Sequence, residues 1–173
     1  FPFVGIEPDR TVLSAALEEM RGSGTCLAAD MSDSHCLHVA ACEEKAGPEL
    51  LYAVQYFGFD DPRGKIPELP HLLALRGVVP ERRITLAGHA LYSTHPETLR
   101  LAHKWCKEHR RPFFLHLAES MEETRQLFHG DGELADLFRR AGILPDSYHP
   151  PGCSPTAYAG RLGLLGPNTV AVH

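Results

Sequence analysis

"RRITLAGHALYSTHPETLRLAHKWCKEHRRPFFLHLAES", residues 82–120, contains two short apolar runs and an amphipathic segment that joins them. The runs ITLAGHA (84–90) and PFFLHLA (112–118) have the length and composition of buried strands. Between them Thr94 and Glu97 match a capping box, and Pro96 stands in the first turn of a helix that we expect to reach about His109. Strand, helix and strand in this order predict a parallel βαβ unit.

The same alternation continues on both sides of this segment. Further strands are expected in residues 25–33, 49–59 and 168–173, and further helices in residues 11–20, 36–45 and 132–142 and after Ser154. Asp9 is the expected N-cap of the first of these helices, and Ser154 that of the last, with Pro155 at its first position. Ser120 with Glu123 forms a second capping box, directly after the strand that contains His116. The sequence therefore predicts an α/β fold in which parallel strands alternate with helices.

The amino-acid composition indicates what kind of protein this is and which kinds of partner it can bind. A length of 173 residues with 43% hydrophobic and 23% charged residues is typical of one globular domain, or of part of one. The net charge of −5, without a stripe of Lys and Arg, disfavours nucleic acid and acidic membrane surfaces as partners. Five cysteines without a CxxC pair indicate reduced thiols, as in the cytoplasm. We expect a small-molecule ligand.

Histidines end three of the five expected strands. They are His89, His116 and His173, and Glu119 follows the second of these strands by a short turn. In parallel α/β sheets, functional groups gather at the carboxyl ends of the strands. We therefore expect these four side chains to lie at one edge of the sheet.

His116 and Glu119 suit metal-assisted hydrolysis. Neutral imidazole is a common ligand of catalytic zinc or iron, and a glutamate can move protons to and from a water molecule that a metal activates. The alternative is structural: a core histidine bonded to a backbone carbonyl, with Glu119 as a favourable charge at a helix N-terminus. His173 could converge with His116 on one metal or one water, although a catalytic zinc typically takes three protein ligands.

Other functional readings have less support in the sequence. His89 could instead order the loop between strand and helix, and Cys153 has no partner that the sequence fixes for a nucleophile. GxGxxG, Walker and GxSxG motifs are absent from the sequence, which disfavours nucleotide-phosphate binding and serine hydrolysis.

Four motifs together resemble the amidohydrolase superfamily, in particular its nucleoside and guanine deaminases and triazine chlorohydrolases. GHALYSTHPETL resembles the segment after barrel strand four, PFFLHLAES the His-x-x-Glu signature of strand five, and LLGPNTVAVH the approach to the strand-six histidine. GSGTCLAADMSD is similar to the strand-two region. Gly88 and Leu91 stand where the family usually has prolines, and the strand-one His-x-His pair and strand-eight aspartate have no counterpart.

The resemblance implies a fold and a function. Residues 1–173 would be strands two to six of a (β/α)8 TIM-type barrel, in a metal-dependent hydrolase that deaminates a purine-like or nucleoside-type heterocycle, with aminofutalosine deaminases as one possibility. His116 and His173 would hold a divalent metal, zinc or iron. Glu119 and His173 would be catalytic, and His89 and Glu119 would contact the substrate. The alternatives are amide or C–Cl hydrolysis, or a segment without activity of its own. Because part of a barrel exposes strand edges, we also expect a homo-oligomer.

Overall fold

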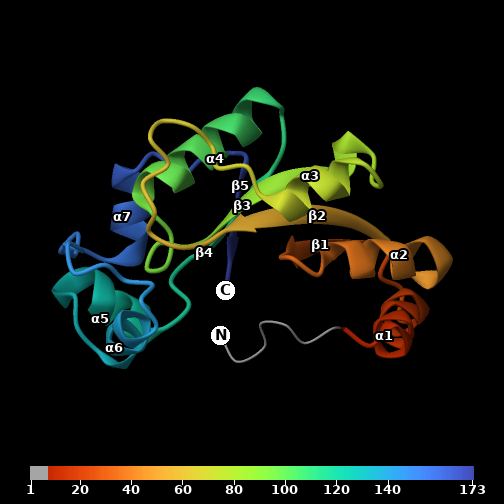
Figure 1. Ribbon diagram of the computed structural model, residues 1–173, viewed down its shortest axis with the longest axis horizontal. Coiled ribbons are helices and arrows are strands. Elements are labelled where there is room, and N and C mark those ends of the chain that lie inside the picture. The colour runs from red at the N-terminus through yellow and green to blue at the C-terminus, as the bar shows by residue number, and fades with distance from the viewer. Residues whose placement is uncertain (1–7) are drawn as a thin grey trace. The chain divides into compact units, whose positions relative to one another are not determined.

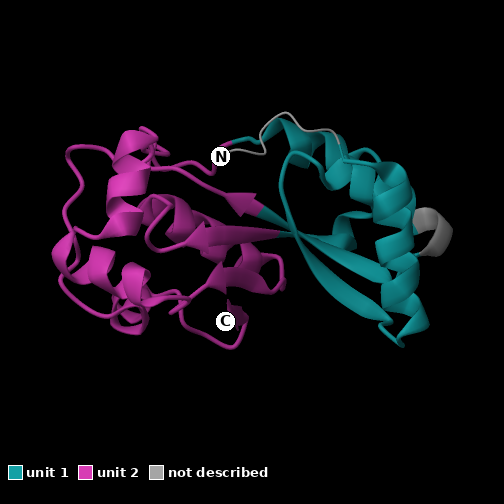
Figure 2. Ribbon diagram, turned by 90° about the horizontal axis from the view of Figure 1, so that it is seen from below, with its two compact units in different colours: residues 1–54, 68–85 teal, residues 55–67, 86–173 magenta. Residues whose placement is uncertain are grey.

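The computed structural model describes residues 8–173, and for residues 44–46 it describes the backbone alone. The chain divides into two compact units, which Figure 2 colours teal and magenta. Unit 1 comprises residues 1–54 and 68–85, and unit 2 comprises residues 55–67 and 86–173.

Unit 1 consists of strands and helices that alternate along the chain (Figure 1). Its elements are α1 (Arg10–Gly22), β1 (Leu27–Ser32), α2 (Cys36–Ala46), most of β2 (Glu49–Tyr56), α3 (Pro70–Arg76) and a 3-10 turn (Glu81–Arg83). Asp9 caps α1 by accepting the N–H of Thr11, as the sequence predicts. β1 and β2 pair in parallel, with Leu27 opposite Glu49.

A partly buried polar network ties α2 to β2 in unit 1. The carboxylate of Glu43 accepts the N–H of Leu50 and the hydroxyl of Tyr52, and it pairs with the guanidinium of Arg83. Arg83 also donates to the carbonyl of Leu50. Every charge in this network therefore has a partner, as buried ions require.

Unit 2 contains most of β3 (Ile84–Ala90) and all later elements. These are α4 (Pro96–Glu108), β4 (Phe113–His116), α5 (Met121–His129), α6 (Glu133–Arg140), α7 (Pro155–Arg161) and β5 (Thr169–Val172). β4 pairs in parallel with both β3 and β5, α4 packs on β4, and α5 lies beside α6 (Figure 1). The strand order is the chain order, β1-β2-β3-β4-β5.

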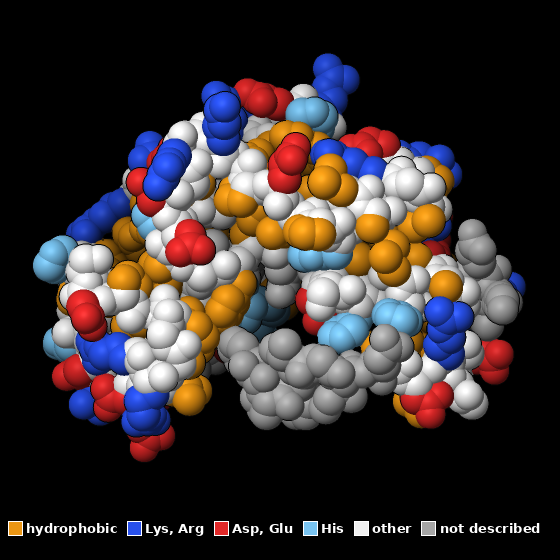
Figure 3. Space-filling model, viewed as in Figure 1, with side chains coloured by type: hydrophobic (Ala, Val, Ile, Leu, Met, Phe, Trp, Pro, Cys, Tyr) orange, Lys and Arg blue, Asp and Glu red, His pale blue; other side chains and the backbone are white. Residues whose placement is uncertain are grey.

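The predicted α/β fold is confirmed. Parallel strands alternate with helices, as in part of a (β/α)8 TIM-type barrel. β3 and β4 are buried along nearly their whole length, which is typical of strands covered on both faces. In residues 8–173, no helix is long and apolar enough to cross a membrane. On the face seen in Figure 3, acidic and basic side chains are interspersed over α5 and α6.

The predicted capping box of α4 is wrong in one respect. The hydroxyl of Thr94 donates to the carbonyl of Tyr56 instead of capping the helix, and His95 is the N-cap residue. The ring Nδ1 of His95 accepts the N–H of Glu97 at 3.2 Å. Thr94 thus joins the start of α4 to the end of β2, a contact that local sequence cannot reveal. By contrast, the predicted Ser154 cap of α7 is confirmed.

Gly88 offers a test of the packing between β3 and α4. A Cβ at this position would lie 2.0 Å from Cδ2 of Leu99, which is completely buried. Gly88→Ala should therefore lower the free energy of unfolding by about 1–3 kcal/mol, because the core must shift. Gly160→Ala in α7 is the control, since its nearest neighbour is 3.9 Å away and alanine favours a helix. Equal stability of both variants in urea unfolding would contradict this packing.

Candidate active site

The pairing of β4 with β5 brings two of the predicted site histidines together. His116 stands opposite Val172 in the parallel register, and the N–H of Leu117 donates to the carbonyl of Val172. His173 follows directly. Nδ1 of His116 lies 2.8 Å from Nε2 of His173, so one ring nitrogen carries the proton and the other accepts it.

An irregularity in β3 adds His89 to this pair. The register between β3 and β4 shifts between Gly88 and Ala90, which leaves His89 without a paired residue on β4, as in a β-bulge. The ring of His89 lies 5.3 Å from the ring of His116, centroid to centroid, in an edge-to-face arrangement. Its Nδ1 is 2.6 Å from the hydroxyl of Ser93, which fixes the orientation of the ring.

The turn after β4 places Glu119 at the start of α5. Ala118 has φ +60°, a left-handed conformation that costs a residue with a side chain about 1 kcal/mol or more. The predicted capping box of α5 is confirmed on one side: Ser120 accepts the N–H of Glu123. The carboxylate of Glu123 returns to the N–H of Glu119, at 2.7 Å. This bond holds the backbone of Glu119 in place.

Two side chains contact the carboxylate of Glu119. Tyr92 donates its hydroxyl to Oε2 at 2.9 Å, and Nε2 of His173 lies 3.9 Å from Oε1. Tyr92 is itself buried and stacks on Phe138 of α6, with ring centroids 5.8 Å apart. Glu119 is therefore linked to the histidine cluster on one side and to an aromatic layer on the other.

Burial keeps two histidines of this cluster, His89 and His116, neutral. It lowers the pKa of His89 to about 4, with the neighbouring His116 as a further cause. Burial also lowers the pKa of His116, with His173 as a further cause. Neutral imidazole is the form that can bind a metal or accept a proton. Burial likewise raises the pKa of the Glu123 carboxyl.

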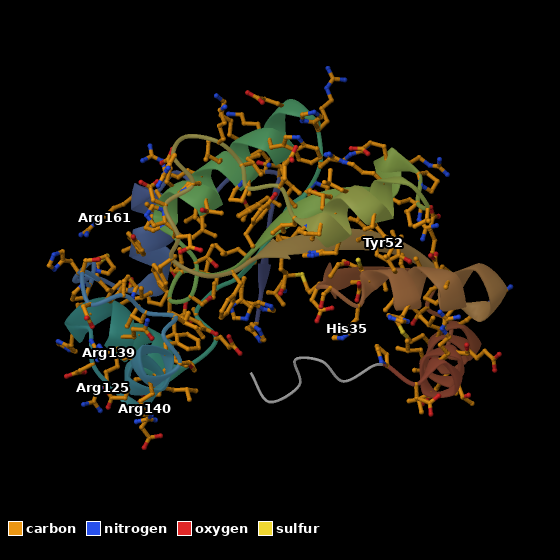
Figure 4. The ribbon with its side chains drawn as sticks, viewed as in Figure 1. His35, Tyr52, Arg125, Arg139, Arg140 and Arg161 are labelled. Carbon is orange, nitrogen blue, oxygen red and sulfur yellow. The ribbon has the colours of Figure 1, made fainter. Side chains whose placement is uncertain are left out.

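A cavity of about 680 Å³ opens beside Glu119 and Tyr92. Leu134 and Leu137 of α6 supply apolar wall, while Arg140 supplies the only cation among its lining residues. Figure 4 labels Arg140 on α6. The volume is in the range of small-molecule sites. The rest of the lining is polar and mainly acidic, with carboxylates of Glu119, Glu122, Glu133 and Asp136.

The residues present fit part of a metal site. The rings of His116 and His173 lie side by side near the carboxylate of Glu119, and imidazole nitrogens with a carboxylate oxygen are the donor chemistry of zinc and iron sites. Within the described part of the chain, no group of three or more His, Cys, Asp or Glu side chains could hold a metal ion. The pair therefore supplies fewer than the three protein ligands that a catalytic zinc typically takes.

The structure brings together all four side chains that the sequence selects: His89, His116, Glu119 and His173. Sequence reasoning missed Tyr92, although it stands within the quoted GHALYST motif, since nothing local pairs it with Glu119 27 positions later. It also missed Phe57, whose ring lies 5.1 Å from the ring of His89. Cys153 is buried as a free thiol.

The chain is similar in sequence to a curated deaminase. No family model matches the chain. The 5-methylthioadenosine/S-adenosylhomocysteine deaminase of Desulfovibrio desulfuricans is 29% identical over 119 residues, which are 66% of this chain and 27% of the deaminase. The chain thus spans well under half the length of this relative.

Solved structures with the same fold include two enzymes. One is atrazine chlorohydrolase TrzN from Arthrobacter aurescens, complexed with zinc. The superposition covers 95% of this chain and 37% of the chlorohydrolase, with a TM-score of 0.64 and 15% identity. The other is aminofutalosine deaminase from Helicobacter pylori, in complex with methylthio-coformycin. Here the superposition covers 85% of this chain and 36% of the deaminase, with a TM-score of 0.62 and 16% identity. At these identities the likeness concerns the fold.

The raised pKa of Glu123 predicts a pH-dependent contribution to stability. A carboxyl whose pKa is higher in the folded state stabilises the fold below its ordinary value of 4.5, and this contribution is lost as the pH rises through the folded pKa. The stability advantage of the wild type over Glu123→Gln should therefore shrink as the pH rises from below 4.5. Urea unfolding of both proteins at several pH values measures it, and an advantage that grows with pH would refute the assignment.

Proposed function

From the resemblance to the amidohydrolase superfamily, which the comparisons support, we propose that this chain is part of a metal-dependent hydrolase that deaminates a nucleoside-type heterocycle. Residues 1–173 would correspond to about strands two to six of the barrel. The observation that carries the proposal is the convergence of His89, His116, His173 and Glu119 at the ends of β3, β4 and β5.

Each side chain of the site has a distinct task in this proposal. His116 and His173 would hold the metal, each through an unprotonated ring nitrogen. A zinc or iron ion, when bound, would polarise a water molecule and make it a nucleophile near neutral pH. Glu119 takes a proton from the water that adds to the ring carbon and gives it to the amino group, which leaves as ammonia. His89, neutral and fixed by Ser93, contacts the heterocycle.

The cavity beside Glu119 supports a substrate of nucleoside size. Its volume is about 680 Å³, and Leu134 and Leu137 provide apolar contact for a ring or an alkyl group. The name of the curated relative suggests 5-methylthioadenosine and S-adenosylhomocysteine as first substrates to test. Aminofutalosine is the next, after the Helicobacter pylori enzyme. Chloride release from a triazine would instead favour the chemistry of the chlorohydrolase neighbour.

We also propose a cytoplasmic homo-oligomer. All five cysteines are free thiols, which favours a reducing compartment. Leu27 on β1 and Val170 on β5 are exposed on the two end strands of the sheet, and such apolar strand edges favour association. We place activity in the full-length protein, since this chain supplies an incomplete set of metal ligands.

Glu119→Gln tests the proton transfer. In the full-length protein, the variant should lose about 10²–10⁴-fold in kcat for ammonia release, because the amide cannot accept the proton. Glu108→Gln is the matched control, because Glu108 lies at the exposed end of α4 and pairs only with Lys104 among the ion pairs described. Its kcat should equal that of the wild type. Undiminished turnover by Glu119→Gln would exclude Glu119 as the proton carrier.

Metal content tests the role of the two histidines. We expect about one zinc or iron per full-length chain by elemental analysis, as for a mononuclear hydrolytic site. His116→Ala and His173→Ala should each lower this content, whereas His109→Ala on the exposed end of α4 should not. A full-length protein that is purified without chelator and holds no metal would return His116 to a structural role.

A further inference from the structure

We propose that Tyr92 is a positioning residue for Glu119. Its hydroxyl holds one oxygen of the carboxylate, so that the other oxygen faces His173. This inference rests on the proposed function, because it concerns the same proton transfer, and it assigns a task to a side chain that the functional argument has not used.

The contacts of Glu119 distinguish its two oxygens. Oε2 accepts the hydroxyl of Tyr92 at 2.9 Å, whereas Oε1 lies 3.9 Å from Nε2 of His173. The terminal torsion of a glutamate is broad, so an unrestrained carboxylate would turn its plane freely. The bond from Tyr92 to one oxygen restrains this plane and keeps the other oxygen on the side of His173, where it can receive a proton.

Tyr92 is held firmly enough to impose this choice. Its side chain is 6% exposed, and its ring is nearly parallel to the ring of Phe138, with an interplanar angle of 19°. The completely buried Gln126 donates its side-chain amide to the backbone carbonyl of Tyr92 at 2.8 Å. The backbone of Tyr92 is therefore bonded to α5, and its ring is packed on α6.

The chemistry of the pair fixes the direction of the bond. An ionised carboxylate can only accept hydrogen bonds, and the phenol is the donor. Burial raises the pKa of Tyr92, with Glu119 as a further cause, so the hydroxyl keeps its proton at neutral pH. The backbone of Glu119 is restrained independently by the carboxylate of Glu123. Tyr92 thus restrains the one part of Glu119 that remains free to rotate.

Tyr92→Phe removes the hydroxyl and retains the stacking ring. In the full-length enzyme, kcat should fall about tenfold, because a misplaced catalytic group loses rate without losing affinity. KM should stay within about twofold, and metal content should be unchanged. Tyr158→Phe in α7 is the matched control, since it deletes the same atom from a half-buried tyrosine of the same unit. An unchanged kcat, or a parallel loss of kcat, substrate affinity and metal, would overturn the proposal.

A second measurement separates this inference from the proposed function. In a double-mutant cycle with Glu119→Ala, Tyr92→Phe should lower the folding equilibrium constant about fivefold in the wild type and hardly at all in the Glu119→Ala background. If the wild type turns over none of the substrates, the proposed function fails while the cycle still reports whether the hydroxyl holds the carboxylate. Equal effects of Tyr92→Phe in both backgrounds would refute the contact itself.

Discussion

The in-register parallel pairing of β4 with β5 is the constraint on which the candidate site depends. Because parallel strands end at the same edge of a sheet, the pairing of His116 with Val172 sets His173 beside the ring of His116. A slip of one residue would turn every side chain of β5 to the other face. The site is therefore a consequence of strand register, and the helices α5, α6 and α7 serve to bring β5 back to that register.

The turn that positions Glu119 has an unfavourable backbone conformation. Ala118 adopts a left-handed conformation that a residue with a Cβ rarely takes. Two bonds around this turn offset the cost: Ser120 accepts the N–H of Glu123, and the carboxylate of Glu123 accepts the N–H of Glu119. Strain at a turn that carries a functional side chain agrees with the common location of strained residues at active sites.

Much of this architecture could be predicted from the sequence, because the signals are local. The apolar runs around His89 and His116, the Ser120 and Ser154 caps and the order of strands and helices all depend on short stretches of chain. The shift of register at His89 could not be predicted, since it depends on how β3 packs against β4. Thr94 failed as a cap for a similar reason: a carbonyl 38 positions earlier, that of Tyr56, takes its hydroxyl. The contact of Tyr92 with Glu119 is equally non-local.

In our proposal, side chains at the strand ends perform the reaction, and side chains of α6 select the substrate. His89, His116 and His173 belong to strand ends, where the sheet fixes their positions, whereas Leu134, Leu137 and Arg140 reach the cavity from α6. A helix after a strand can change its exposed side chains without altering the strand register, so one set of strand-end groups can serve several leaving groups. In keeping with this separation, both a deaminase and a chlorohydrolase share the fold of this chain. In our proposal the side chains of α6 that line the cavity would therefore select the substrate: the apolar Leu134 and Leu137, the acidic Glu133 and Asp136, and the basic Arg140.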